Sequence, residues 1–141
     1  MKLRDQYRII EFGEFGDERG NLVVAECGGI DVPFDVKRVF YIYGSDPDVI
    51  RGRHANRKTE FVLINVSGSS KVKLDNGKET TVVELDRPRM GLYIPTMLWK
   101  DMYDFSEDSV LLVLCSEHYI GNEYIRDYDE YIKEVSGTDN E

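Results

Sequence analysis

The sequence is poor in cysteine and has no long apolar run. It contains only Cys27 and Cys115, far apart and without a Cys-x-x-Cys pair, so we expect two reduced core thiols rather than a zinc or redox motif. No run of about 18 apolar residues is present, which excludes a membrane-spanning helix, and the first residues lack the apolar segment of an export signal. These absences predict a cytoplasmic globular protein that has no membrane partner.

The chain also lacks a general excess of basic residues. Its formal net charge is −9, and residues 101–141 hold twelve Asp and Glu against Arg126 and Lys133, whereas residues 1–100 are close to neutral. A domain that binds nucleic acid usually presents a basic face over much of its surface. A nucleic-acid partner is therefore not expected.

Short apolar segments separated by turn residues dominate the chain. Strands are expected at residues 7–15, 21–26, 37–43, 59–68, 70–74, 80–85, 92–94 and 109–115. The sequence Asp75-Asn-Gly-Lys78 predicts a tight hairpin turn, because Asn-Gly readily adopts two positive φ angles. No βαβ alternation or phosphate-loop glycine pattern is present. The pattern is typical of an all-β barrel or jelly roll, the cupin double-stranded β-helix included.

Only the C-terminal end has helical periodicity. From Tyr124 to Val135, apolar and aromatic residues recur at the spacing of an amphipathic helix, which we expect Gly137 to end. The sequence thus predicts a single cupin domain over residues 1–136 with a short C-terminal α-helix, followed by a disordered tail over residues 137–141.

The densest polar cluster lies directly before the most apolar strand. The stretch Arg51-Gly-Arg-His-Ala-Asn-Arg-Lys58 holds four cations, one of the two histidines and an amide. His54 and Asn56 are alternate residues, so on a strand they share one face, and Glu60 has the same parity. This predicts that reactive polar side chains lie at the open end of a β-sheet core.

The same residues resemble a cupin metal motif with two of its ligands replaced. Gly52-x-His54-x-Asn56-x-x-x-Glu60 resembles the first conserved motif of the cupins, in which two histidines and a glutamate bind a metal. Asn56 stands in place of the second histidine, and Lys100 stands where the later cupin segment would supply another. An ammonium cannot bind a metal, and an amide oxygen is a poor ligand for the softer divalent ions. We therefore expect a cupin without metal or other cofactor.

A narrower resemblance covers nearly the whole chain. In combination, its motifs resemble the dTDP-sugar 3,4-ketoisomerases of the FdtA/QdtA (WxcM-like) type. The motifs are Asp17-x-Arg-Gly-x-Leu22, Lys37-Arg-Val-Phe-Tyr-Ile42, Arg51-Gly-x-His-Ala55, Gly91-Leu-Tyr93, Trp99, Asp104-Phe-Ser106 and Tyr124-Ile-Arg-x-Tyr-Asp129. The resemblance implies a metal-free homodimer that converts dTDP-4-keto-6-deoxyglucose into its 3-keto isomer, for the amino sugars of surface polysaccharides such as lipopolysaccharide.

The implied reaction moves a carbonyl from C4 to C3 through an enediol, so it needs proton transfer at both carbons. Histidine suits this role because its unperturbed pKa lies near neutrality, and His54 is the candidate base. The family motif reads His-Ala-His-Lys, with both histidines implicated in proton transfer, whereas this chain reads His54-Ala-Asn-Arg57. Asn56 cannot act as a base at neutral pH. His54 must then make both transfers or share them with Lys100, a tyrosine or water.

Cations and hydroxyl groups elsewhere supply the other candidate site residues. A guanidinium binds two diphosphate oxygens at once, and a cation or hydroxyl aimed at the developing oxyanion lowers the barrier. Tyr41 is the further catalytic candidate beside His54 and Asn56. The expected substrate-binding residues are Arg19, Arg51, Tyr43, Glu60 and Lys100.

Two other functions stay open. One is a relative that has lost catalysis and only binds a nucleotide sugar. This alternative is considered because Asn56 replaces the second motif histidine. The other is a metal-dependent cupin epimerase or dioxygenase. A plainer interpretation makes His54 a hydrogen-bonded structural residue, with Arg53, Arg57 and Lys58 as a solvated rim.

Overall fold

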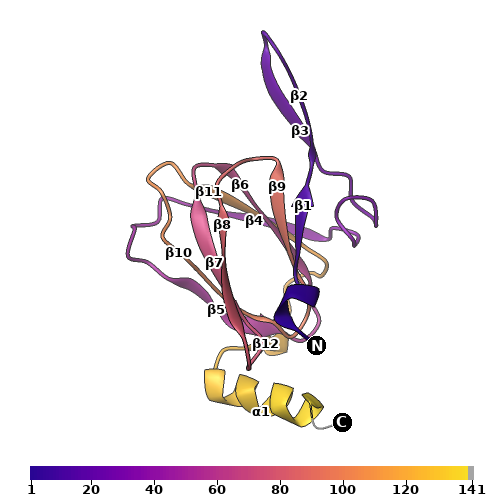
Figure 1. Cartoon of the computed structure of the whole chain (residues 1–141), viewed down its shortest axis with the longest axis vertical. Helices are drawn as coiled ribbons and strands as arrows, with labels where there is room; N and C mark the ends of the chain where they lie inside the picture. Colours follow the sequence, from indigo (N-terminus) through magenta and orange to yellow (C-terminus); the bar gives the residue numbers. More distant parts are fainter. Residues whose placement is uncertain (140–141) are drawn as a thin grey trace.

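The fold consists of two five-stranded antiparallel β-sheets that face each other (Figure 1). The computed structural model describes residues 1–139, and for residues 138 and 139 only the backbone. In spatial order the first sheet contains β1 (Arg8–Glu11), β9 (Met90–Ile94), β6 (Phe61–Ser67), β11 (Val110–Cys115) and β4 (Arg38–Tyr43). The second contains β12 (Tyr124–Ile125), β5 (Arg51–Asn56), β10 (Trp99–Tyr103), β7 (Ser70–Asp75) and β8 (Thr80–Leu85). The expected cupin-type jelly roll is confirmed.

The main hydrophobic core fills the space between the two sheets. Phe61 and Leu63 of β6 meet Val72 and Leu74 of β7 there. The intervening residue Val62 points to the opposite face of the first sheet, where Val32 and Phe34 from the segment before β4 cover it. This double burial explains why β6 is a continuous apolar run rather than an alternating one. The residues of the outer cluster are Ile10, Phe12, Val32, Phe34, Val62, Ile64 and Leu114.

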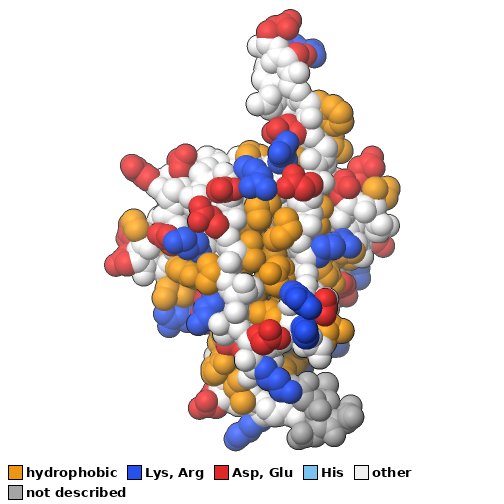
Figure 2. All heavy atoms as spheres, viewed as in Figure 1, with side chains coloured by type: hydrophobic (Ala, Val, Ile, Leu, Met, Phe, Trp, Pro, Cys, Tyr) orange, Lys and Arg blue, Asp and Glu red, His pale blue; other side chains and the backbone are white. Residues whose placement is uncertain are grey.

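A two-stranded hairpin projects beyond the barrel (Figure 1). It consists of β2 (Gly13–Asp17) and β3 (Gly20–Val24), so the single strand expected at residues 7–15 is two strands, separated by the buried Phe12. Phe15 is 64% exposed and Leu22 is 58% exposed. Figure 2 shows charged side chains at the tip of the hairpin and apolar side chains nearer its base. The rest of the described chain leaves this apolar surface uncovered.

The hairpin between β7 and β8 is present, but its turn is longer than expected. Asp75 pairs with Thr80, which leaves four residues in the loop, and only Gly77 of them has a positive φ, of 94°. The side-chain oxygen of Asn76 accepts hydrogen bonds from the backbone N–H groups of Lys78 and Glu79. Because Asn76 stabilises the loop in this way, the two-residue turn does not form, and that prediction was wrong.

The C-terminal helix α1 (Tyr128–Asp139) starts later and ends later than its apolar pattern suggests. The carboxylate of Asp127 accepts from the N–H groups of Asp129 and Glu130 and caps the helix, while residues 124–125 form β12. The helix continues through Gly137, so the stop expected there is wrong, and residues 140–141 of the expected tail lie outside the described residues. No helix in the described part of the chain is long and apolar enough to cross a membrane.

The helix covers the outer face of the second sheet at one end of the barrel (Figure 1). Tyr131 is fully buried against Ala55, Trp99 and Ile125, and its hydroxyl donates to the backbone oxygen of Met97 at 2.9 Å. Burying such a ring contributes on the order of 2–3 kcal/mol. The helix thereby fixes β12 against β5, which positions the residues described below.

The two cysteines do not share one environment. Cys115 on β11 is fully buried in the core, as expected. Cys27 is exposed, because β3 ends at Val24 and the cysteine lies in the turn beyond it. The prediction of two core cysteines was therefore right for Cys115 and wrong for Cys27.

Candidate active site

His54, Asn56 and Lys100 lie on the inner face of the second sheet. Lys100 on β10 is the Cα partner of His54 on β5, so the two side chains leave the sheet on the same side. Lys100 is only 2% exposed, and its ammonium lies 4.1 Å from the centre of the Phe61 ring, which belongs to the core between the sheets. Asn56 is buried as well. The shared inner face of His54 and Asn56 is the one that their parity predicts.

The imidazole of His54 is held neutral. Burial, with the positive charges of Lys100 and Arg126, lowers its pKa to about 3, and a hydrogen bond with Asn56 opposes the shift. The ring meets the edge of Tyr124 with 4.9 Å between centroids. Its Nδ1 atom is buried and has no hydrogen-bond partner within residues 1–139. His54 therefore has an uncharged imidazole on the inside of the barrel, and its Nδ1 atom is unpaired within the described chain.

The side-chain amide of Asn56 connects a lysine to a carboxylate. Lys100 Nζ donates to Asn56 Oδ1 at 3.4 Å, and Asn56 Nδ2 donates to Glu123 Oε1 at 2.9 Å. An amide has one acceptor end and one donor end, so these two neighbours define its orientation. Burial lowers the pKa of Lys100 to about 7, while Cys115 and Glu123 oppose the shift. The lysine therefore exchanges protons close to neutral pH.

Glu123 is a buried carboxylate at the end of the short helix η2 (Gly121–Glu123). It accepts hydrogen bonds from the backbone N–H groups of Lys58 and Thr59, both at 3.2 Å, and from the Thr59 hydroxyl. Burial raises the pKa of its carboxyl, but the hydrogen bonds from Thr59, Asn56 and Lys58 outweigh burial and bring the pKa below its usual value. Glu123 is an anion at neutral pH, although sequence reasoning gave it no role.

Arg38 brings a second cation to the inner face from the first sheet. It is the Cα partner of the buried Cys115, and its Nη2 donates to the hydroxyl of Tyr124 at 3.3 Å. Its guanidinium lies 5.5 Å from the centre of the Tyr119 ring, and its Nε is buried without a partner in the described chain. The alternation Arg38-x-Phe40-x-Ile42 was the available signal in the sequence, because Ile42 is a core residue.

A β-bulge brings Arg51 to the same side as His54. His54 pairs with Lys100, but Gly52 pairs with Asp101 and Arg51 with Met102, so Arg53 is the extra residue and has a φ of 55°. Met102 is a core residue, so Arg51 leaves the strand on the inner side, at its exposed start. Without the bulge the guanidinium would point outward.

The polar groups on the inner side are an imidazole, an amide, an amine and two guanidinium groups. Among residues 1–139 no three His, Cys, Asp or Glu side chains converge as a metal site would require. A family model described as "FdtA: WxcM-like, C-terminal" matches residues 5–136. The chain belongs to this family.

Relatives of known activity match the chain over most of its length. The TDP-4-oxo-6-deoxy-alpha-D-glucose-3,4-oxoisomerase of Aneurinibacillus thermoaerophilus is 40% identical over 129 residues, which is 92% of each chain. A double mutant of the QdtA 3,4-ketoisomerase from Thermoanaerobacterium thermosaccharolyticum, in complex with TDP, is 45% identical with a TM-score of 0.91, over 94% of this chain and 96% of that one. A single mutant of QdtA, in complex with TDP-4-keto-6-deoxyglucose, is 44% identical with a TM-score of 0.90, over 94% and 95%.

Tyr41 and Tyr43, which the sequence offered as further site residues, lie on the outer face of β4 within one chain. They have the opposite parity to Arg38 on β4, and Tyr41 is 62% exposed on the outside of the sheet. Their rings stack on each other with 6.3 Å between centroids. Within one chain these tyrosines do not face His54, because alternate residues of a strand point to opposite faces. Their expected roles in the site stay predictions.

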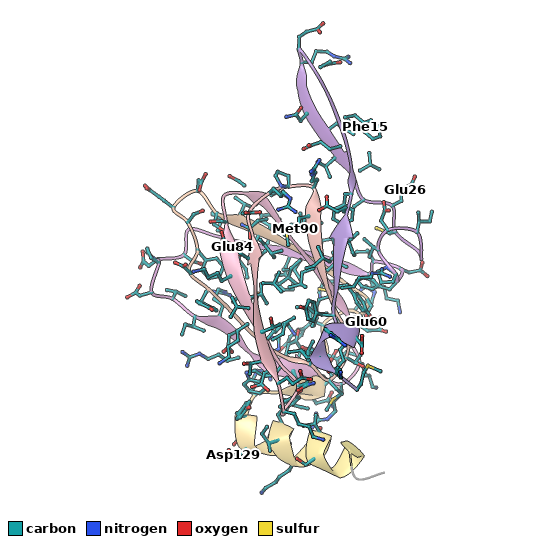
Figure 3. The ribbon with its side chains drawn as sticks, viewed as in Figure 1. Phe15, Glu26, Glu60, Glu84, Met90 and Asp129 are labelled. Atoms are coloured by element: carbon teal, nitrogen blue, oxygen red, sulfur yellow. The ribbon has the colours of Figure 1, made fainter. Side chains whose placement is uncertain are left out.

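Glu60 and Arg19 also lie apart from His54 within one chain. The chain turns after Asn56 into the other sheet, so parity with His54 no longer applies to Glu60, which accepts from the hydroxyl of Tyr93 at 2.6 Å (Figure 3). Tyr93 pairs with the outward-facing Val62, so the expected shared face for Glu60 is wrong. Arg19 lies at the turn of the projecting hairpin, paired with Asp17 at 2.6 Å. The structure thus brings together His54, Asn56 and Lys100, with Arg51 on the same side.

Proposed function

We propose that the chain is a nucleotide-sugar 3,4-ketoisomerase that acts on dTDP-4-keto-6-deoxyglucose and supplies deoxyamino-sugar synthesis for surface polysaccharides. Relatives at 40–45% identity carry the names of this activity. One observation carries the proposal: a neutral imidazole and an amine with a pKa of about 7 leave adjacent strands toward the same interior. Two such groups suit proton transfer at two neighbouring carbons.

The reaction uses these groups in sequence. His54 takes the C3 proton, the electrons of the C–H bond form a C3=C4 double bond, and the C4 carbonyl oxygen becomes an enediolate oxygen facing Lys100. Lys100 donates a proton to the C4 oxygen and then takes the C3 hydroxyl proton, which forms the new carbonyl at C3. The protonated His54 returns its proton to C4, so both groups regain their starting forms. Asn56 cannot exchange protons, so His54 and Lys100 carry both transfers. The Lys100 ammonium also stabilises the charge on the enediolate oxygen.

The cations around the mouth suit the diphosphate of the substrate. Arg51 and Arg38 approach the inner face from opposite sheets, and a guanidinium binds phosphate oxygens in pairs. We also propose a cytoplasmic setting, and the free thiols of Cys27 and Cys115 are the form that a reducing compartment maintains.

A second copy of the chain is the expected partner. The hairpin β2–β3 exposes Phe15 and Leu22, and the outer face of β4 exposes Val39 and Tyr41. Exposed apolar surface of this kind marks an interface, so the protein forms a homodimer. In that dimer the hairpin also carries Arg19 toward the neighbouring chain, where it remains a candidate for substrate binding.

The activity is tested by hydrogen exchange. In deuterated water, the C3 hydrogen of dTDP-4-keto-6-deoxyglucose should exchange for deuterium, and the 3-keto isomer should carry deuterium at C4. Proton NMR measures both changes. A sugar that keeps its C3 hydrogen and its C4 carbonyl would reject the proposal.

A second candidate function is binding of a nucleotide sugar without turnover. The observation in its favour is the amide of Asn56, which occupies the inner face and cannot act as a base. Calorimetry that finds tight dTDP binding, together with no turnover of any keto-sugar, would support it. Turnover that is lost in His54→Ala would exclude it.

A further inference from the structure

Glu123 and Lys100 lie at opposite ends of one amide. The donor end of Asn56 meets the carboxylate at 2.9 Å, and the acceptor end meets the ammonium at 3.4 Å. Reversing the amide would place its oxygen against the carboxylate and its N–H groups against the ammonium. Both contacts would then be repulsive, so the carboxylate keeps the amide oxygen directed at Lys100.

We propose that Glu123 is a positioning residue for Lys100, acting through the side chain of Asn56. This inference rests on the proposed function, because it assigns Glu123 a part in the same reaction. Glu123 does not touch the inner face itself. It fixes the amide, the amide oxygen holds one hydrogen of the ammonium, and the remaining hydrogens of Lys100 stay available to the substrate.

The carboxylate also influences the charge of Lys100. The titratable groups around this amine are His54 on β5, Cys115 on β11 and Glu123 on η2, with Arg126 beyond His54. Among them Glu123 is the group held as an anion by its hydrogen bonds. Its charge stabilises the ammonium and raises the pKa of Lys100, against the larger effect of burial. Glu123 thus keeps Lys100 protonated at a pH where burial alone would neutralise it.

A purely structural role for Glu123 makes a different prediction. The carboxylate also receives the backbone N–H groups of Lys58 and Thr59, which fixes the turn after β5. A residue that only fixed this turn would affect stability but would not change the ionisation of Lys100. Glu123→Gln separates the two roles, because its amide oxygen can still accept from these donors and its NH₂ can donate to the Thr59 hydroxyl, while the charge is lost.

The test is a titration of Lys100 by NMR in protein labelled with ¹³C at lysine Cε. The Lys100 signal is assigned as the one that disappears in Lys100→Arg. In the unaltered protein the midpoint is expected near pH 7, and in Glu123→Gln it should fall by about one pH unit. Glu84→Gln, which removes an exposed carboxylate from the outside of β8 (Figure 3), is the matched control and should leave the midpoint unchanged.

An unchanged midpoint in folded Glu123→Gln would overturn the inference. If that variant does not fold, Asn56→Leu removes the amide instead and leaves the carboxylate with its backbone donors. Its Lys100 midpoint should also fall, and an unchanged value would overturn the inference equally. The titration needs no substrate, so a protein inert toward keto-sugars still gives a result. Conversely, active enzyme with an unchanged midpoint would reject the role of Glu123 and leave the isomerase function intact.

Discussion

Lys100 and His54 are direct partners across β10 and β5, so an amine and an imidazole leave neighbouring strands on the same face. Opposite residues of an antiparallel pair have Cβ atoms roughly 5 Å apart. At this range the charge of Lys100 adds to the effect of burial, which together bring the pKa of His54 to about 3. Burial and this charge together keep the histidine unprotonated, which is the form a base requires, and the same shift makes the imidazole a weaker base than one with a pKa near 7.

Loss of the imidazole should abolish proton removal without affecting nucleotide binding. General base catalysis contributes about 10²–10⁴ in rate, so His54→Ala should lower the rate of C3 exchange by at least about 100-fold. Its dTDP affinity, measured by calorimetry, should stay within a few-fold of the unaltered protein. His118→Ala removes an exposed histidine and is the control. Exchange that survives in His54→Ala would assign the base elsewhere.

The rate should depend on the protonation of Lys100. In the mechanism the ammonium is the active form, so kcat/KM should be level below pH 7 and fall by about tenfold per unit above it, given a pKa of about 7. Lys100→Arg keeps the charge at all these pH values and should remove the fall. A rate that instead rises through pH 7 would show that the neutral amine is the active form.

The buried ammonium of Lys100 should also lower the free energy of unfolding, by an amount that depends on pH. Its pKa falls from 10.5 when unfolded to about 7 in the fold, so between these values the unfolded chain binds the extra proton and stability rises with pH. At pH 7, Lys100→Met should therefore increase the free energy of unfolding by on the order of 4 kcal/mol. Urea denaturation at pH 7 and pH 10 measures the difference between the two proteins. A gain that does not shrink toward pH 10 would contradict the depressed pKa.

Replacing Asn56 with histidine should increase the exchange rate. The new imidazole would lie beside the Glu123 carboxylate, which favours the protonated form and raises its pKa toward neutrality. A second group able to transfer protons should raise the C3 exchange rate by about 10- to 100-fold. Asn56→Gln is the control, because it keeps an amide. A folded Asn56→His variant that binds dTDP without any gain would show that His54 and Lys100 already suffice.

Polar residues on the hairpin should weaken self-association. Phe15→Ser combined with Leu22→Ser removes the exposed apolar side chains of β2 and β3, so the protein should sediment as a monomer at micromolar concentration. Val82→Ser, an exposed site on the outside of β8, should leave the dimer intact. Unaltered protein that is already monomeric would contradict the proposed homodimer.

The alternation of apolar and polar residues predicted the barrel and the face of the strand on which His54 lies. His54 and Asn56 lie on one strand, so parity placed them correctly, and parity failed for Glu60 only because the chain changes sheets before it. The inward position of Arg51 depends on a bulge at Arg53, whose positive φ has no signature in the residue type.

Contacts between segments that are far apart in the chain could not be predicted from the sequence. Glu123 meets Asn56 across 67 positions of the chain, and no periodicity connects them. The inward position of Arg38 could have been predicted, because alternation along its strand places it on the same face as the core residue Ile42. The same alternation would have excluded Tyr41, which has the opposite parity.

The groups that close the site come from the last segment of the polypeptide. Glu123 and Tyr124 follow every long strand of the barrel, so a ribosome that stops just before them releases both sheets without the carboxylate that orients Asn56. Premature termination in this segment would thus yield an inert barrel, even where the sheets still form. Translation itself makes the site one of the last features to be completed.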